Sequence, residues 1–181
     1  EQYPEVRDHF ARQMNNRFIF SDVEVFLGSP MGGILLAGDL AQVADARVIF
    51  AEKKVTALGT ESQREKSVLV IDRHEIWAKG EVVIVEDVCN NFSTTDQLIR
   101  LVAELGGKVV GVACFLNRSP HTIVPGTDIP VWSLLHIPTV QYRQDDPAVA
   151  ADIEAGNVVW KPKKEWPRLT AAMDAPELIS I

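Results

Sequence analysis

Residues 80–117 carry the sequence GEVVIVEDVCNNFSTTDQLIRLVAELGGKVVGVACFLN, and this stretch decides the fold. An apolar run at 82–85 leads into the acidic pair Glu86 and Asp87, then a short polar loop, then a helix that opens at Ser93. An uninterrupted apolar run is typical of a strand buried on both faces of a parallel sheet. We therefore expect the two acids where the strand leaves the sheet, at the edge where open α/β sheets bind ligands.

The loop and helix start after the acids form a candidate phosphate site. Free backbone N–H groups, the hydroxyls of Ser93 and Thr94 and a helix N-terminus lie side by side there, an arrangement that holds phosphate without a lysine. Carboxylates do not hold phosphate, but they bind Mg²⁺ or sugar hydroxyls. The combination predicts a phosphorylated sugar, with its phosphate in the loop and its ribose over the acids.

Length and composition favour one globular domain. The chain has 181 residues, 46% of them hydrophobic, and a net charge of -7, which argues against a general nucleic-acid surface. We expect one domain over residues 1–167 and a loose tail over 168–181. Both cysteines, Cys89 and Cys114, lie on or beside predicted buried strands. No apolar run is long enough to cross a membrane, so we expect a reduced, cytoplasmic compartment.

A second strand, turn and helix precede the acid pair. Residues 23–27 form a predicted strand, 28–33 (GSPMGG) a glycine-bearing turn, and 34–44 an apolar helix. A helix N-terminus after such a turn is a candidate anion site. Glycine at this place in many α/β turns serves only the turn itself, and both interpretations stand at this point.

The next predicted strand, 47–53, ends in positive charge. Lys53 and Lys54 follow its apolar part and could neutralise an anion, although lysines at a strand end are commonly solvated. Residues 55–77 are polar and weakly patterned, as in a mobile lid. Arg64 and Lys66 within this segment are candidates to close over an anion, with solvated loop charge as the alternative, and His74 is expected to be structural.

The strand predicted at 109–116 delivers three polar residues, Asn117, Arg118 and Ser119, to the same edge. A guanidinium suits a planar carboxylate, which it grips through two bonds. A salt bridge or a helix-end contact is the alternative role for Arg118. Flanking elements are predicted at 4–18 (an amphipathic helix), 130–137 (a strand) and 147–155 (a short helix).

The order and spacing of these motifs resemble those of type I phosphoribosyltransferases, and most closely orotate phosphoribosyltransferases. In that family an apolar strand ends in two acids and leads into a phosphate loop, as 82–94 does here. The glycines of 28–33 match the pyrophosphate loop, Lys53 matches a lysine after a Phe-Ala-Glu segment, and Arg118 with Ser119 matches an Asp-Arg-Ser motif. Phe92 stands where the family has a glycine.

The alternation of apolar strands with amphipathic helices predicts an α/β fold with a mostly parallel sheet of about five strands, helices on both faces and a β-ribbon lid over 55–77, and the resemblance implies the same fold. The resemblance implies transfer of ribose 5-phosphate from phosphoribosyl pyrophosphate (PRPP) to a pyrimidine, with orotate as the expected base, by a homodimer with small-molecule substrates and Mg²⁺. A non-catalytic nucleotide-binding or regulatory protein on the same fold is the alternative.

The site residues that the resemblance implies fall into four groups. The catalytic residues would be Glu86, Asp87 and Lys66. Those on PRPP would be Gly28, Ser29, Met31, Gly32, Gly33, Lys53, Lys54, Asn90, Asn91, Phe92, Ser93 and Thr94. The residues on the base would be Asn90 and Arg118. Glu86 and Asp87 would also hold Mg²⁺ indirectly, through PRPP.

Overall fold

The chain divides into two compact units, Glu1–Thr139 and Val140–Ile181. The computed structural model describes residues 3–18, 20, 23–57, 66–72, 80–160 and 162–171. The sequence had placed the boundary at residue 167 instead. A single domain over residues 1–167 followed by a tail stays a prediction.

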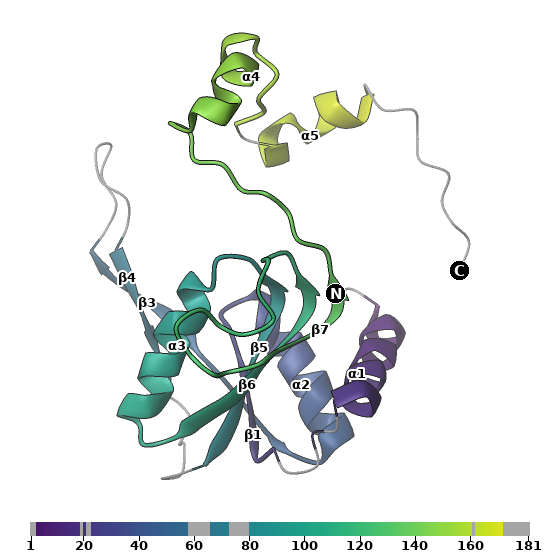
Figure 1. The fold of residues 1–181 in the computed structure, drawn as a ribbon. Helices are drawn as coiled ribbons and strands as arrows, with labels where there is room; N and C mark the ends of the chain where they lie inside the picture. The colour runs from purple at the N-terminus through teal and green to yellow at the C-terminus, as the bar shows by residue number, and fades with distance from the viewer. Residues whose placement is uncertain are drawn as a thin grey trace. The chain divides into compact units, whose positions relative to one another are not determined.

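The first unit is built on a five-stranded parallel sheet with the order β2-β1-β5-β6-β7. Its strands are β1 (Val25–Gly28), β2 (Arg47–Phe50), β5 (Glu81–Cys89), β6 (Lys108–Asn117) and β7 (Val131–His136). This confirms the predicted α/β fold, and helices cover both faces of the sheet (Figure 1).

Side chains alternate across β5 as a strand buried on both faces requires. Val83 and Val85 pack in one cluster with helices α1 (Pro4–Phe18) and α2 (Gly32–Ala44). Val82 and Ile84 pack in the other, beside α3 (Ser93–Glu104). The continuous apolar run therefore serves two cores at once. Helix α1 has the predicted bounds and presents Ala11 and Met14, both fully buried, to the α2 side.

The strand order places a switch point between β1 and β5. From β1 the chain crosses through α2 to β2 on one side, and from β5 it crosses through α3 to β6 on the other. The two turns that follow β1 and β5 therefore flank one crevice at the carboxyl edge, where ligands bind in open α/β sheets. Both candidate anion sites predicted from the sequence lie at this crevice.

An antiparallel ribbon leaves the sheet after β2 and confirms the predicted β-ribbon, with one correction to its start. Strands β3 (Glu52–Ala57) and β4 (Lys66–Val70) pair with each other, and not with the main sheet. The predicted single strand 47–53 is thus wrong at its end, because buried Ala51 separates β2 from β3 and its N–H donates to the Gly28 carbonyl (3.0 Å). Arg64 and His74 lie outside the described residues.

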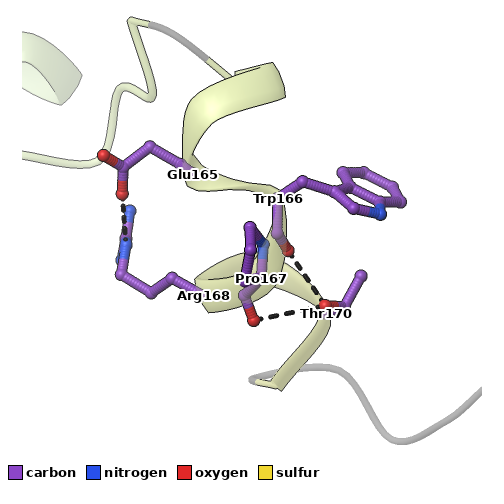
Figure 2. A network of polar contacts seen from close by, with 5 residues as sticks. All are labelled: Glu165, Trp166, Pro167, Arg168 and Thr170. Atoms are coloured by element: carbon purple, nitrogen blue, oxygen red, sulfur yellow. Dashed lines mark hydrogen bonds and ion pairs between the residues drawn. The ribbon is translucent and has the colours of Figure 1, made fainter.

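The second unit contains a short 3-10 helix η1 (Pro147–Val149), α4 (Ala150–Glu154) and α5 (Pro162–Ala171). Helix α5 continues past residue 167, where a loose tail was expected. Figure 2 shows how it does so: Arg168 pairs with Glu165 (2.7 Å), and the Thr170 hydroxyl is bonded to the carbonyls of Trp166 (2.9 Å) and Pro167 (3.2 Å). These local contacts help to hold a turn in which Pro167 cannot donate a backbone bond.

Within the described ranges, no helix combines the length and the apolar character needed to cross a membrane.

Candidate active site

Strand β5 extends beyond its neighbour β1, and the acid pair lies in this extension. Pairing with β1 ends at Gly28 opposite Val85, whereas pairing with β6 continues to Cys89 opposite Asn117. The acids are therefore inside the strand, where the sequence had predicted them just beyond its end. Their side chains stand at the crevice because β1 has already turned away.

The two acids have different environments. Glu86 is 9% exposed and accepts a hydrogen bond from the Ser29 hydroxyl (2.5 Å between Oγ and Oε2). The pKa of Glu86 is raised to about 7, and burial of the carboxyl is the largest cause. The hydrogen bond from Ser29 opposes this shift, the charge of Asp87 adds to it, and the charge of Lys53 opposes it. Asp87 is exposed and accepts from the Val88 N–H (2.8 Å). Asp87 is thus the more solvent-accessible of the two carboxylates.

The glycine turn packs directly on the acid-bearing strand. A Cβ at Gly32 would lie 2.5 Å from the Asp87 carboxyl carbon, and one at Gly33 would collide with the Val85 carbonyl oxygen. One at Gly28 would lie 2.8 Å from the backbone of Ile34. These glycines are needed for close approach of backbone and side chain, which is the structural role left open above, and they also bring the start of α2 to the acids.

Met31, inside this turn, adopts a strained backbone conformation. Its φ of 71° and ψ of -68°, with a bond from the Gly32 N–H to the Pro30 carbonyl (3.1 Å), define a γ-turn that non-glycine residues rarely form. Its side chain is 84% exposed. Backbone strain of this kind persists where the surrounding structure fixes it, and it is concentrated at functional sites.

The predicted phosphate loop, residues 90–94, borders a small cavity of about 150 Å³ at the start of α3. The cavity is lined by Glu86, Val88, Cys89, Asn90, Asn91, Phe92, Ser93, Thr94 and Thr95. The Asn91 side chain accepts from the Ser93 N–H (3.1 Å) and so orders the first turn. Predicted residues 90–94 thus lie together around one hollow at a helix N-terminus.

Phe92 takes the conformation that a glycine would favour. Its φ of 58° is left-handed, and its ring is only 4% exposed, packed in the α3-side core. The sequence placed a bulky side chain in the phosphate loop, but the ring belongs to the core. Phe92 therefore adopts a left-handed backbone conformation that usually favours glycine, while its ring is buried.

The predicted lysines lie on the ribbon. Lys53 and Lys54 are exposed on β3, and the charge of Lys53 acts on Glu86. Lys54 forms an exposed ion pair with Asp72 (3.7 Å). This favours Lys53 over Lys54 for an anion in the crevice. The backbone of Lys66 pairs with Ala57 in the ribbon, whereas its side chain lies outside the described part of the structure.

Arg118 reaches the same edge from β6. Its N–H donates to the Cys89 carbonyl (2.8 Å), and its Nε donates to Thr139 Oγ1 (2.9 Å). Asn117, in contrast, is fully buried and structural: its amide donates to the His121 carbonyl (2.7 Å) and accepts from the Ser119 N–H (2.9 Å). This network fixes the turn that carries Arg118.

An apolar groove of about 300 Å³ beside Asp87 was missed by sequence reasoning. It is lined by Tyr3, Val6, Arg7, Phe10, Gly32, Leu35, Leu36, Asp87, Val88, Phe115 and Leu116. The sequence predicted only an amphipathic helix over 4–18 and gave no sign that part of this helix lines a groove, where Val6 is 42% exposed. The buried bond from Ser29 to Glu86 was also missed, because no local pattern marks it.

The acid pair fits a metal that comes with its own ligands. Among the described residues no cluster of three or more metal-ligating side chains occurs. Mg²⁺ commonly takes one or two carboxylates from a protein and its other ligands from phosphates and water. Exposed Asp87 fits that role, with Glu86 behind it.

The family model for the phosphoribosyl transferase domain matches residues 3–149. The chain belongs to this phosphoribosyltransferase family. It is 32% identical over 146 residues to an orotate phosphoribosyltransferase of Caldanaerobacter subterraneus subsp. tengcongensis, covering 80% of this chain and 70% of that relative. A second relative of the same name, from a Thermoanaerobacter species, is 28% identical over the same shares.

Solved structures agree on the fold of this phosphoribosyltransferase chain. The adenine phosphoribosyltransferase of Rhodothermus marinus superposes with a TM-score of 0.57 at 24% identity, over 75% of this chain and 81% of its own. The orotate phosphoribosyltransferase of Aeropyrum pernix superposes with a TM-score of 0.56 at 17% identity, over 73% and 70%. At these identities the likeness shows the fold and leaves the acceptor base to be determined.

Proposed function

We propose that this protein transfers ribose 5-phosphate from PRPP to a pyrimidine base, with orotate as the base. The observation that carries the proposal is the meeting of three parts at one switch point: the glycine turn, the acid pair and the phosphate loop. A phosphorylated sugar with a pyrophosphate leaving group needs these three parts in this order.

The proposed binding mode follows from the positions of the parts. The 5-phosphate occupies the hollow at residues 90–94, where the N-terminus of α3 favours an anion. The ribose hydroxyls lie over Asp87 and Glu86. The pyrophosphate lies on the glycine turn at the start of α2, within reach of positive charge from Lys53. Mg²⁺, when bound with PRPP, would neutralise pyrophosphate charge, and Asp87 would hold it.

The chemistry asks little of side chains beyond charge and position. The bond from the sugar C1 to the pyrophosphate oxygen breaks, pyrophosphate keeps the electron pair, and the ring nitrogen of the base bonds to C1 and gives up its proton. Positive charge develops on the sugar, and the exposed carboxylate of Asp87 stabilises it. We assign Lys66 to the leaving pyrophosphate, as the ribbon lid implies.

The base would lie beside Arg118 and Asn90. The Arg118 guanidinium suits the carboxylate of orotate, and apolar Val88 and Leu116 beside Asp87 suit the face of a flat ring. Two curated relatives named orotate phosphoribosyltransferase support this acceptor over the adenine of several structural neighbours.

The deciding experiment is turnover by the purified protein with PRPP, Mg²⁺ and orotate, with adenine in a parallel reaction. We expect orotate-dependent release of pyrophosphate. Turnover with adenine alone would overturn the acceptor, and binding of PRPP without turnover of any nucleobase would support the non-catalytic alternative. The homodimer is tested by sedimentation at micromolar concentration, where we expect a dimer.

A further inference from the structure

The Ser29 hydroxyl joins the glycine turn to the acid pair. Ser29 follows β1, and its Oγ lies 2.5 Å from Glu86 Oε2 on β5. Its side chain is 1% exposed, and that of Glu86 is 9% exposed. A serine hydroxyl has one proton to donate, and here it goes to the carboxylate. The hydroxyl is therefore committed inside the protein and does not face the crevice.

Three further contacts make this junction tight. The Ser29 N–H donates to the Val85 carbonyl (2.9 Å), and the Cα of Gly33 packs on that same carbonyl. Gly32 lies against the Asp87 carboxylate. Two successive acids of β5 are thus each touched by the glycine turn, Glu86 through a hydrogen bond and Asp87 through close packing.

The strained γ-turn at Met31 lies between these anchors. Ser29 is two residues before Met31, and Gly32 and Gly33 directly follow it. A rare backbone conformation survives only where its flanks are held. The buried hydrogen bond from the Ser29 hydroxyl to Glu86 holds the first flank.

We propose that Ser29 is a positioning residue that makes the pyrophosphate-binding turn and the ribose-binding acids one preorganised unit, without itself touching PRPP. This inference rests on the proposed function. It changes the role that the resemblance implied for Ser29, from a PRPP contact to a link between two halves of the site. Preorganisation favours a ligand that spans both halves over a ligand that occupies one.

The test compares three ligands by calorimetry on wild type and Ser29→Ala. PRPP spans both halves, inorganic pyrophosphate occupies the glycine turn alone, and ribose 5-phosphate occupies the acids and the phosphate loop. We expect Ser29→Ala to weaken PRPP binding about tenfold, equivalent to about 1.4 kcal/mol. The affinities for pyrophosphate and for ribose 5-phosphate should each change less than about twofold. In turnover, the KM for PRPP should rise while that for the base stays unchanged.

Two controls separate positioning from general loosening. Ser119→Ala removes a hydroxyl that is similarly buried (2% exposed) but bonded to Asn117, so the ratio of PRPP to pyrophosphate affinity should stay at the wild-type value. In a Glu86→Gln background, the further change Ser29→Ala should reduce the affinity for PRPP less than it does in wild type, because the carboxylate acceptor is already gone. Ser29→Cys keeps a side-chain donor but a weaker one, in a slightly larger side chain, and serves if Ser29→Ala does not fold.

Each contrary outcome is distinct. A pyrophosphate affinity that falls as far as that of PRPP would make Ser29 a direct ligand contact. Unchanged affinity for all three ligands would reduce it to packing. An equal loss in Ser119→Ala would mean general loosening. Wild-type protein that binds no PRPP would overturn the proposed function itself, whereas failure of the inference alone leaves wild-type binding intact.

Discussion

The turns after β1 and β5 are built on the same plan and completed differently. Each follows a parallel strand, each leads into a helix that flanks the crevice, and each places a non-glycine residue with positive φ just before that helix, Met31 in one and Phe92 in the other. Met31 is 84% exposed, whereas Phe92 is 4% exposed. A positive φ is thus stabilised by surrounding contacts at Met31 and by a buried side chain at Phe92.

The two turns also differ in what lines the crevice. In the glycine turn the side chains are small or point away, and the backbone approaches the acids directly. In the phosphate loop polar side chains line the hollow, and Asn91 orders the helix start. One turn is held by its neighbour β5, and the other by its own side chains and the core beneath it.

The largest expected effect is the difference in stability cost between alanine variants of the two positive-φ residues. Phe92→Ala removes a buried ring and should lower the free energy of unfolding by about 3–5 kcal/mol. Met31→Ala keeps the same backbone strain and loses an exposed side chain, so its cost should stay below about 1 kcal/mol. Urea denaturation measures both, and similar costs would show that the Phe92 ring does not anchor its loop.

The pH dependence of stability sharpens the contrast between the two acids. The pKa of Glu86 is raised from 4.5 to about 7 in the folded protein, chiefly by burial. The folded state therefore binds this proton more tightly, and the contribution of Glu86 is fully present below pH 4.5 and is lost as the pH rises through about 7. The loss is about 3 kcal/mol at most.

Glu86→Gln should flatten the stability profile in that window, because glutamine does not ionise. Asp87→Asn should keep most of the slope, because Glu86 remains buried. Denaturation midpoints between pH 5 and pH 8 measure this. An unchanged slope in Glu86→Gln would place the titrating group elsewhere.

Asp87→Asn tests the exposed acid in catalysis. Asparagine can still accept from the Val88 N–H, so the melting temperature should hardly change. Turnover should fall about 10²-fold, since a negative charge is lost where positive charge develops on the sugar. Asp96→Asn, in the first turn of α3, is the matched control and should retain turnover. Normal activity in Asp87→Asn would make the acid pair structural.

The smallest effect concerns the side-chain bond that α3 has and α2 lacks. Asn91→Ala removes the acceptor of the Ser93 N–H and should cost about 1 kcal/mol of stability. Asn91→Asp keeps that acceptor and adds negative charge beside the hollow, so stability should stay unchanged and the affinity for ribose 5-phosphate should fall. Calorimetry and thermal melting separate the two. If Asn91→Asp and wild type bind ribose 5-phosphate equally well, the hollow is not the phosphate site.

Local sequence patterns predicted much of this architecture because the forces involved act over a few residues. The four-residue spacing of apolar side chains gave α1 its bounds, 4–18, and the run at 82–85 gave the central strand. Ser93 marked the start of α3. Both turns at the switch point were found as candidate sites, since glycines, hydroxyls and acids at strand ends are visible without coordinates.

Long-range pairing decided what those patterns left open. Strand β5 extends to Cys89 because β6 continues to pair with it, and β3 leaves the sheet because β4, from beyond residue 65, supplies its partner. Helix α5 crosses the predicted tail boundary through contacts of Arg168 and Thr170 that no apolar pattern signals.

The sequence by itself determined the layered α/β fold, the order of the motifs and the residue types at the crevice, because strand burial and helix periodicity are encoded by neighbouring residues. Only the tertiary structure decided that Ser29 faces Glu86, that the Phe92 ring enters the core, and that Asp87 is the acid left open. These outcomes depend on which surfaces meet when β1, β5 and α3 pack together, and residues 57 positions apart carry no local trace of that meeting.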